Sequence, residues 1–230
     1  MSLYDRNIAS SYENERYAES SRSAFIKQTY QLFAASLLAA SAGAYIGTGF
    51  AGALVGGGYW VLVIAELALL FGLQAAKRKS PLNLILLFAF TFVSGLTLAP
   101  IIAITMASAQ GGIIVAQAFT LTTVAFGGLS FFAMNTKRDF SAMGKMLFIA
   151  VIILVVASLI NLFFQSSTAS LVISSIGAFV FSAFILYDTQ NIIKGAYETP
   201  IEGAVALYLD FVNLFVSLLQ ILRAFSGSRD

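Results

Sequence analysis

The chain has 230 residues, of which 59% are hydrophobic and 10% are charged, with a net charge of +2. Soluble domains carry about 25% charged residues, so this composition indicates a polytopic membrane protein, and the small, dispersed charge argues against a nucleic-acid partner. Cysteine and histidine are absent, which excludes disulfides, thiol nucleophiles, zinc clusters of these residues and any catalytic triad that needs imidazole.

The first 24 residues are polar and mixed in charge, and they lack the basic start and short apolar core of a signal peptide. We interpret residues 1–24 as a disordered cytoplasmic tail and residues 25–230 as one membrane domain. Seven apolar stretches follow, each suited to the roughly 20-residue helix that crosses a bilayer. The predicted spans are Ile26–Gly47, Tyr59–Ala76, Leu82–Met106, Ile113–Met134, Met146–Phe164, Leu171–Ile193 and Ala204–Phe225.

Basic residues are restricted to alternate connections between these spans. The first, third and fifth connections contain no Lys or Arg, whereas the second, fourth and sixth contain or border Lys77, Arg78, Lys79, Lys137, Arg138, Lys145 and Lys194. The positive-inside rule then places the N-terminus in the cytoplasm and, after seven spans, the C-terminus outside. Arg223 and Arg229 near the C-terminus oppose this assignment weakly, so a last segment that re-enters the membrane without crossing it stays an alternative.

Three acidic residues lie well inside the apolar spans: Glu66, Asp188 and Asp210. An acid at the centre of a bilayer costs about 2.5–3.5 kcal/mol on insertion scales. Asp188 and Asp210 lie eleven residues before and after Thr199, and Glu66 lies eleven residues before Lys77. The helical rise therefore places all three roughly 10–16 Å from the cytoplasmic face, and we expect them to converge on one interior site that water can reach.

Two carboxylates that are near neighbours in a medium of low dielectric constant cannot both ionise easily. We expect Asp188 and Asp210 to share a proton near neutral pH, and to separate or to bind a cation when they lose it. This is the behaviour of a pH switch or of a divalent-ion site, in which Glu66 would join the pair as a calcium ligand. The competing interpretation is that each acid is structural and bonded to an unrelated neighbour.

A polar stripe and a basic residue accompany the acids. Asp210 is followed at +3, +7 and +10 by Asn213, Ser217 and Gln220. These positions share one helix face, so the last span is predicted to face the bundle interior, with Asn213 in an ion pathway. Lys77 shares a helix face with Glu66 and is predicted to reach the acids as a salt-bridge latch.

Several motifs resemble the Bax inhibitor-1 family, also called the transmembrane Bax-inhibitor-motif family. The resemblance covers about the whole chain after the tail and is most specific in the last two spans. Its pieces are "FVSGLTLAPI", "AQAFTLTTVAF", "TKRDFSAMGKML", "ILYDTQNI" and "ALYLDFVNLFVSLL". The resemblance implies an all-α fold of six helices around a central seventh, and a pH-sensitive calcium leak. The chain resembles short-tailed bacterial members of the family, which suggests a bacterial inner membrane.

The resemblance also implies residue roles. Asp188 and Asp210 match the family's pH-sensing pair, and Glu66 matches a glutamate of its pore. Lys77, with Arg78 adjacent, matches the basic latch. A lysine cannot make the bidentate bridge of an arginine, so closure here is expected to be weaker or to depend on Arg78.

Three functions follow from these observations. The first is a pH-gated calcium or other cation leak, without a cofactor. The second is an interaction protein that regulates a membrane protease or another membrane partner. An intramembrane aspartyl protease is disfavoured because Leu207, Tyr208 and Leu209 precede Asp210 where that chemistry needs a Gly-x-Gly turn, so the chain is predicted not to be an enzyme.

Overall fold

The computed structural model describes residues 3–54 and 56–227, with side chains described for Tyr17 and from Glu19 onward. Seven long helices make up this part of the chain: α1 (Leu3–Thr48), α2 (Gly57–Ala76), α3 (Leu82–Met106), α4 (Gly111–Asn135), α5 (Gly144–Phe164), α6 (Ser167–Lys194) and α7 (Pro200–Ser226). Two short 3-10 turns, Ala51–Leu54 and Ser141–Met143, precede α2 and α5. Every long helix contains a stretch long and apolar enough to cross a membrane. The prediction of an all-α, multi-pass membrane protein is confirmed.

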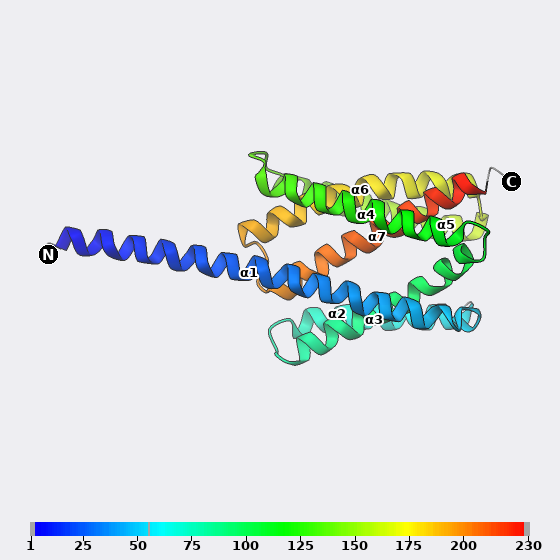
Figure 1. Ribbon diagram of the computed structural model, residues 1–230, viewed down its shortest axis with the longest axis horizontal. Coiled ribbons are helices and arrows are strands. Elements are labelled where there is room, and N and C mark those ends of the chain that lie inside the picture. The colour runs from blue at the N-terminus through cyan, green and yellow to red at the C-terminus, as the bar shows by residue number, and fades with distance from the viewer. Residues whose placement is uncertain (1–2, 55, 228–230) are drawn as a thin grey trace.

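Helix α1 is much longer than its membrane span. It begins at Leu3 and projects beyond the bundle (Figure 1), although its apolar window starts only at Glu19. The structure therefore differs from the expected disordered tail over residues 1–24, of which residues 1–2 lie outside the described part. Extending an existing helix adds one hydrogen bond for each residue that it orders, so the spanning segment can carry the helix into the polar region without a new nucleus.

Helix α7 occupies the centre of the bundle. It packs against α6, α1, α4 and α3, and half of its spanning window is buried, against 11–33% in the other helices. Helices α2 and α5 are peripheral, since α2 packs mainly on α3 and α5 on α6. The expected central position of the seventh helix is therefore present in the described chain, although four helices rather than six make its main contacts. Helix α7 thus has the environment that its polar stripe requires.

Small residues bring α1 and α3 into backbone contact. A Cβ atom placed on Gly95 would lie 2.0 Å from the carbonyl oxygen of Ala40, and one placed on Gly43 would lie 2.1 Å from that of Phe92. No side chain larger than hydrogen fits at either position without a shift of the helices. Close approach through small residues is the usual way in which helices pack in lipid, where no hydrophobic effect drives them together.

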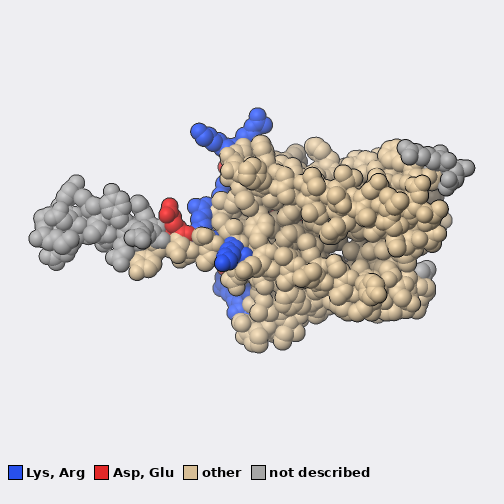
Figure 2. All heavy atoms as spheres, in the orientation of Figure 1, with Lys and Arg blue, Asp and Glu red and all other residues tan. Residues whose placement is uncertain are grey.

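The two ends of the bundle differ in charge. On the face shown in Figure 2, Lys and Arg side chains gather at the end from which α1 projects, and the remaining surface is almost free of charge. Helix α7 begins at this basic end and finishes at the opposite one (Figure 1) without interruption from Pro200 to Ser226. The alternative of a re-entrant last segment does not fit this helix; Arg229 lies outside the described residues.

Candidate functional site

Helices α6 and α7 bring two acids together inside the bundle. The side chains of Asp188 and Asp210 are 5% and 4% exposed, respectively, and their carboxyl groups lie within hydrogen-bonding reach of each other. Because α6 and α7 are joined by a short connection, they form an antiparallel hairpin in which positions equally far from the turn lie opposite each other. We call Asp188 and Asp210 the carboxyl pair.

Two neighbours donate hydrogen bonds to one member of the pair. The Tyr197 hydroxyl lies 2.7 Å from Asp188 Oδ1 and the Asn191 amide nitrogen lies 3.5 Å from it. Among the described residues, no donor reaches the buried Asp210 Oδ2. A buried acceptor without a donor costs about 1–3 kcal/mol, and one proton held between the two carboxyl groups would give each a partner.

Tyr197 was not among the residues selected from the sequence. It lies in the connection between α6 and α7, outside the spanning helices, and its side chain is half-buried. Burial raises the pKa of Tyr197, and the Asp188 carboxylate beside it adds to the shift. The phenol therefore keeps its proton and acts as a hydrogen-bond donor to the pair. No periodicity or motif in the sequence marks this residue.

Glu66 does not join the carboxyl pair. Its Oε2 atom accepts a hydrogen bond of 2.8 Å from Thr97 on α3, the helix on which α2 packs. No group of three acidic side chains in the described chain is arranged to hold a metal ion. The expected convergence of Glu66, Asp188 and Asp210 on a calcium site is therefore not seen, because equal depth along the bundle does not place helices side by side.

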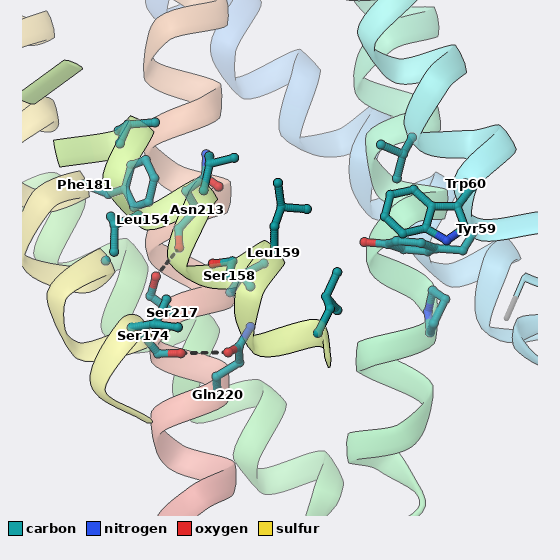
Figure 3. A pocket seen from close by; sticks show the side chains of 18 of the residues that line it. Tyr59, Trp60, Leu154, Ser158, Leu159, Ser174, Phe181, Asn213, Ser217 and Gln220 are labelled. Carbon is teal, nitrogen blue, oxygen red and sulfur yellow. Dashed lines mark hydrogen bonds between the residues drawn. The ribbon is translucent and has the colours of Figure 1, made fainter. Parts of the chain in front are cut away.

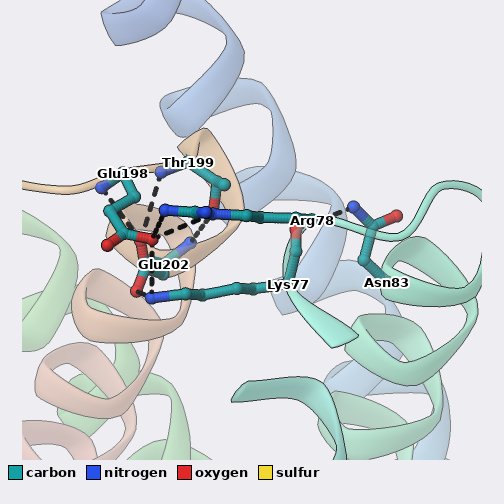
Figure 4. A network of polar contacts seen from close by, with 6 residues as sticks. All are labelled: Lys77, Arg78, Asn83, Glu198, Thr199 and Glu202. Carbon is teal, nitrogen blue, oxygen red and sulfur yellow. Dashed lines mark hydrogen bonds and ion pairs between the residues drawn. The ribbon is translucent and has the colours of Figure 1, made fainter. Parts of the chain in front are cut away.

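The predicted latch residues bind two glutamates instead of the aspartates (Figure 4). Lys77 Nζ lies 2.6 Å from Glu202 Oε1 and 3.0 Å from Glu198 Oε2, and Arg78 Nη2 lies 2.7 Å from the same Glu198 oxygen. The hydrogen bonds that Lys77 donates to Glu202 and Glu198 raise the pKa of Lys77, and the hydrogen bonds that Lys77 and Arg78 donate to Glu198 lower the pKa of Glu198. Lys77 follows the last residue of α2, so it meets acids at the membrane surface before acids buried deeper in α6 and α7.

Glu202 has a second role at the start of α7. Its Oε2 atom accepts hydrogen bonds from the backbone N–H groups of Glu198 (2.9 Å) and Thr199 (3.2 Å). Thr199 accepts in turn from the Glu202 backbone N–H, which completes a capping box. The sequence "TPIE" carries the Thr-x-x-Glu signature of this motif, so the cap could have been predicted, although the contact with Lys77 could not.

The polar stripe of α7 faces a cavity (Figure 3). The cavity has a volume of about 840 Å³ and lies between the α2–α3 and α5–α6–α7 parts of the bundle. Asn213, Ser217 and Gln220 all line it, and Ser174 on α6 donates a 2.7 Å hydrogen bond to Gln220. Asn213 is one helical turn from Asp210, so the polar wall of the cavity ends close to the carboxyl pair.

The comparisons with known proteins agree with this architecture. The family model described as "Inhibitor of apoptosis-promoting Bax1" matches residues 22–227. The chain belongs to the Bax inhibitor-1 family. A Campylobacter jejuni protein is 63% identical over 99% of this chain and its own full length. The Golgi anti-apoptotic protein of vaccinia virus is 42% identical over 71% of this chain and 69% of the viral protein.

Protein lifeguard 4 of mouse is 39% identical over 71% of this chain and 67% of its own length. The family resemblance in the motifs of the last five spans is thus confirmed. In the present chain, α6 and α7 carry the buried acids, and the connection between them carries Tyr197, which contacts an acid, and Glu198, which contacts two bases.

Proposed function

We propose that this Bax inhibitor-1 family member is a pH-sensitive cation leak pathway of a bacterial inner membrane, with calcium as the transported ion. The observation that carries the proposal is the carboxyl pair, buried where the central helix α7 meets α6. The full-length bacterial relative supports the bacterial membrane, and the basic end of the bundle supports a cytoplasmic N-terminus.

The carboxyl pair provides a proton-controlled contact between two helices. With one shared proton, one group donates to the other and α6 and α7 stay together. Without that proton, two negative charges face each other in a medium of low dielectric constant and repel. Separation of α6 from α7 would connect the cavity beside Asn213 to the cytoplasmic end, and the exposed carboxylates would attract a cation.

The ion pairs at the cytoplasmic end support the closed state of this pathway. Lys77 joins the end of α2 to Glu202 at the start of α7, and Arg78 joins it to Glu198. A lysine at the principal position makes single contacts to two carboxylates rather than one bidentate contact. The latch of the proposed pathway therefore acts on the connection between α6 and α7 and not directly on the aspartates.

Calcium flux into liposomes tests the proposal. The purified protein is reconstituted, and flux is followed with an entrapped indicator across a series of pH values. Asp188→Asn and Asp210→Asn should each remove the pH dependence, whereas Asp139→Asn, a change of an exposed acid in the α4–α5 connection, should keep it. Flux whose pH profile is unchanged in both carboxyl-pair variants would refute the proposed gate.

A regulator of another membrane protein, such as a membrane protease, is the second candidate. Helix α1 extends beyond the bundle at the basic end (Figure 1), and this extension supports the candidate. Deletion of the gene and complementation with the Asp188→Asn/Asp210→Asn double variant separates the two functions. Full complementation by a variant without pH-dependent flux would favour the regulator. An intramembrane protease receives no support from α7, which continues as a helix through Asp210.

A further inference from the structure

The connection between α6 and α7 directs one aromatic side chain toward the carboxyl pair. Tyr197 lies in the middle of residues 195–199, and its hydroxyl donates the 2.7 Å hydrogen bond to Asp188. Asp210, the other member of the pair, is also close enough to contribute to the raised pKa of Tyr197. Because the connection lies at the basic end of the bundle, the ring of Tyr197 stands between the pair and the cytoplasmic surface.

Both ends of this connection are held by helix caps. Gly195 ends α6 with φ +71°, in the left-handed region that favours glycine. The N–H of Ala196 bonds to the Asn191 carbonyl at 2.8 Å and that of Gly195 to the Ile192 carbonyl at 3.2 Å, the pattern of a Schellman motif. The Thr199 capping box begins α7. Tyr197 is therefore two residues from a defined cap on either side.

The connection is also held from the side by two other helices. Glu198, the residue after Tyr197, forms ion pairs with Lys77 and Arg78. On α1, the Arg22 guanidinium donates a hydrogen bond to the carbonyl of Ile193 in the last turn of α6. Helices α1 and α2 thus determine where the connection lies over α6 and α7.

We infer that Tyr197 is a lid residue that covers the carboxyl pair on its cytoplasmic side and is held there by the Glu198 ion pairs. The inference rests on the proposed function, because it gives the leak pathway its cytoplasmic closure. Tyr197 acts as a positioning residue through Asp188 and does not itself carry the ion. The groups around its hydroxyl are Asp188 and Asn191 on α6 and Asp210 on α7. Glu198, the next residue in the chain, pairs with the two bases that directly follow α2.

The absence of cysteine from the chain allows a direct test of this lid. Asp210→Cys introduces a single thiol at the pair, and a membrane-impermeant cationic methanethiosulfonate reagent is added to the cytoplasmic side of inside-out vesicles. With Tyr197 present, the thiol should react slowly. Tyr197→Ala should raise the labelling rate about tenfold or more, and Tyr197→Phe should give an intermediate rate, because it keeps the ring and loses only the hydrogen bond to Asp188.

Two further variants complete the test. Glu198→Gln weakens the ion pairs but keeps Tyr197, and it should also raise the labelling rate; it serves as the reporter if Tyr197→Ala does not fold. Tyr187→Ala is the matched control, because Tyr187 precedes Asp188 but its ring packs against Gly144 and α5, so labelling should stay slow. A Ser23→Cys chain, with its thiol at an exposed position of α1, calibrates the access of the reagent.

The outcomes separate this inference from the proposed function. Equal labelling rates with Tyr197, Phe and Ala at position 197, whether fast or slow, would overturn the lid even if calcium flux follows pH as proposed. A lid-dependent labelling rate in a protein without calcium flux would uphold the lid and refute the leak. Labelling needs no ion transport, so neither result depends on the other.

Discussion

The contact between α1 and α3 yields a sharp prediction about stability. Gly95→Ala would place a Cβ atom 2.0 Å from the Ala40 carbonyl oxygen and 2.9 Å from the Ala44 backbone nitrogen, whereas ordinary Cβ contacts begin near 3.4 Å. The difference between 3.4 and 2.0 Å means that the helices must move apart by about 1.4 Å at this point. Backbone atoms obstruct the methyl group, so no side-chain rotation relieves the clash.

The expected cost combines two opposing effects. Overpacking of a tight contact destabilises by about 1–3 kcal/mol, and the better helix propensity of alanine returns up to about 1 kcal/mol. Because only backbone atoms obstruct the methyl group, the upper end of the overpacking range applies, and after the propensity gain we expect Gly95→Ala to lower the free energy of unfolding by about 2 kcal/mol. Gly127→Ala on α4 is the control, because nothing lies within 4 Å of a Cβ atom there, and it should be neutral or slightly stabilising.

Unfolding in detergent micelles, followed by circular dichroism, measures both variants against the native chain. Gly95→Ala should unfold at a lower temperature than the native protein, and Gly127→Ala should not. Gly43→Ala, which makes the reciprocal clash with the Phe92 carbonyl at 2.1 Å, should resemble Gly95→Ala. If Gly95→Ala and Gly127→Ala unfold at the same temperature as the native chain, the backbone contact between α1 and α3 is not as close as described.

Two further predictions concern the two ends of α7. Lys77 and Arg78 lower the pKa of Glu198 in the folded protein. Their contacts therefore stabilise the fold fully above the ordinary glutamate pKa of about 4.3, and this stabilisation is lost as the pH falls through the lower pKa of the folded state. Hydrogen exchange of residues 195–199 should therefore stay slow until the pH drops below about 4. Lys77→Gln should move this transition to a higher pH; a transition at the same pH would refute the link between Lys77 and the pKa of Glu198. At the other end of α7, Gln220→Leu removes the hydrogen-bond partner of Ser174 in the cavity wall. A lost polar contact of about 1 kcal/mol should reduce calcium flux about fivefold. The pH midpoint of the flux should not move.

The number of helices and the depth of the acids were accessible from the sequence because a bilayer imposes simple rules. A span needs about 20 apolar residues, and each residue of a helix rises by 1.5 Å. The seven spans follow from the first rule. The second rule, applied to the short turn around Thr199, brought Asp188 and Asp210 to the same height, and the hairpin of α6 and α7 places them in contact.

Residues on helices that are not joined by a short turn were less predictable. Glu66 has the expected distance from the end of α2, yet it bonds to Thr97 because α2 packs on α3. Lys77 has the predicted side-chain reach, yet it meets Glu202 and Glu198 before any aspartate. In both cases the height along the bundle was insufficient, because it does not specify which helix is the lateral neighbour.

The sequence by itself determined the class of the protein, the seven spans, the family and the position of the carboxyl pair along α6 and α7. Hydropathy, helical rise and local motifs are properties of neighbouring residues, and they need no knowledge of the packing. Only the tertiary structure decided that Tyr197 contacts Asp188, that the latch joins α2 to the start of α7, and that the polar stripe faces a cavity. These contacts depend on which helix surfaces pack together. Close backbone contacts between residues far apart in the sequence, such as Gly95 and Ala40, determine that packing.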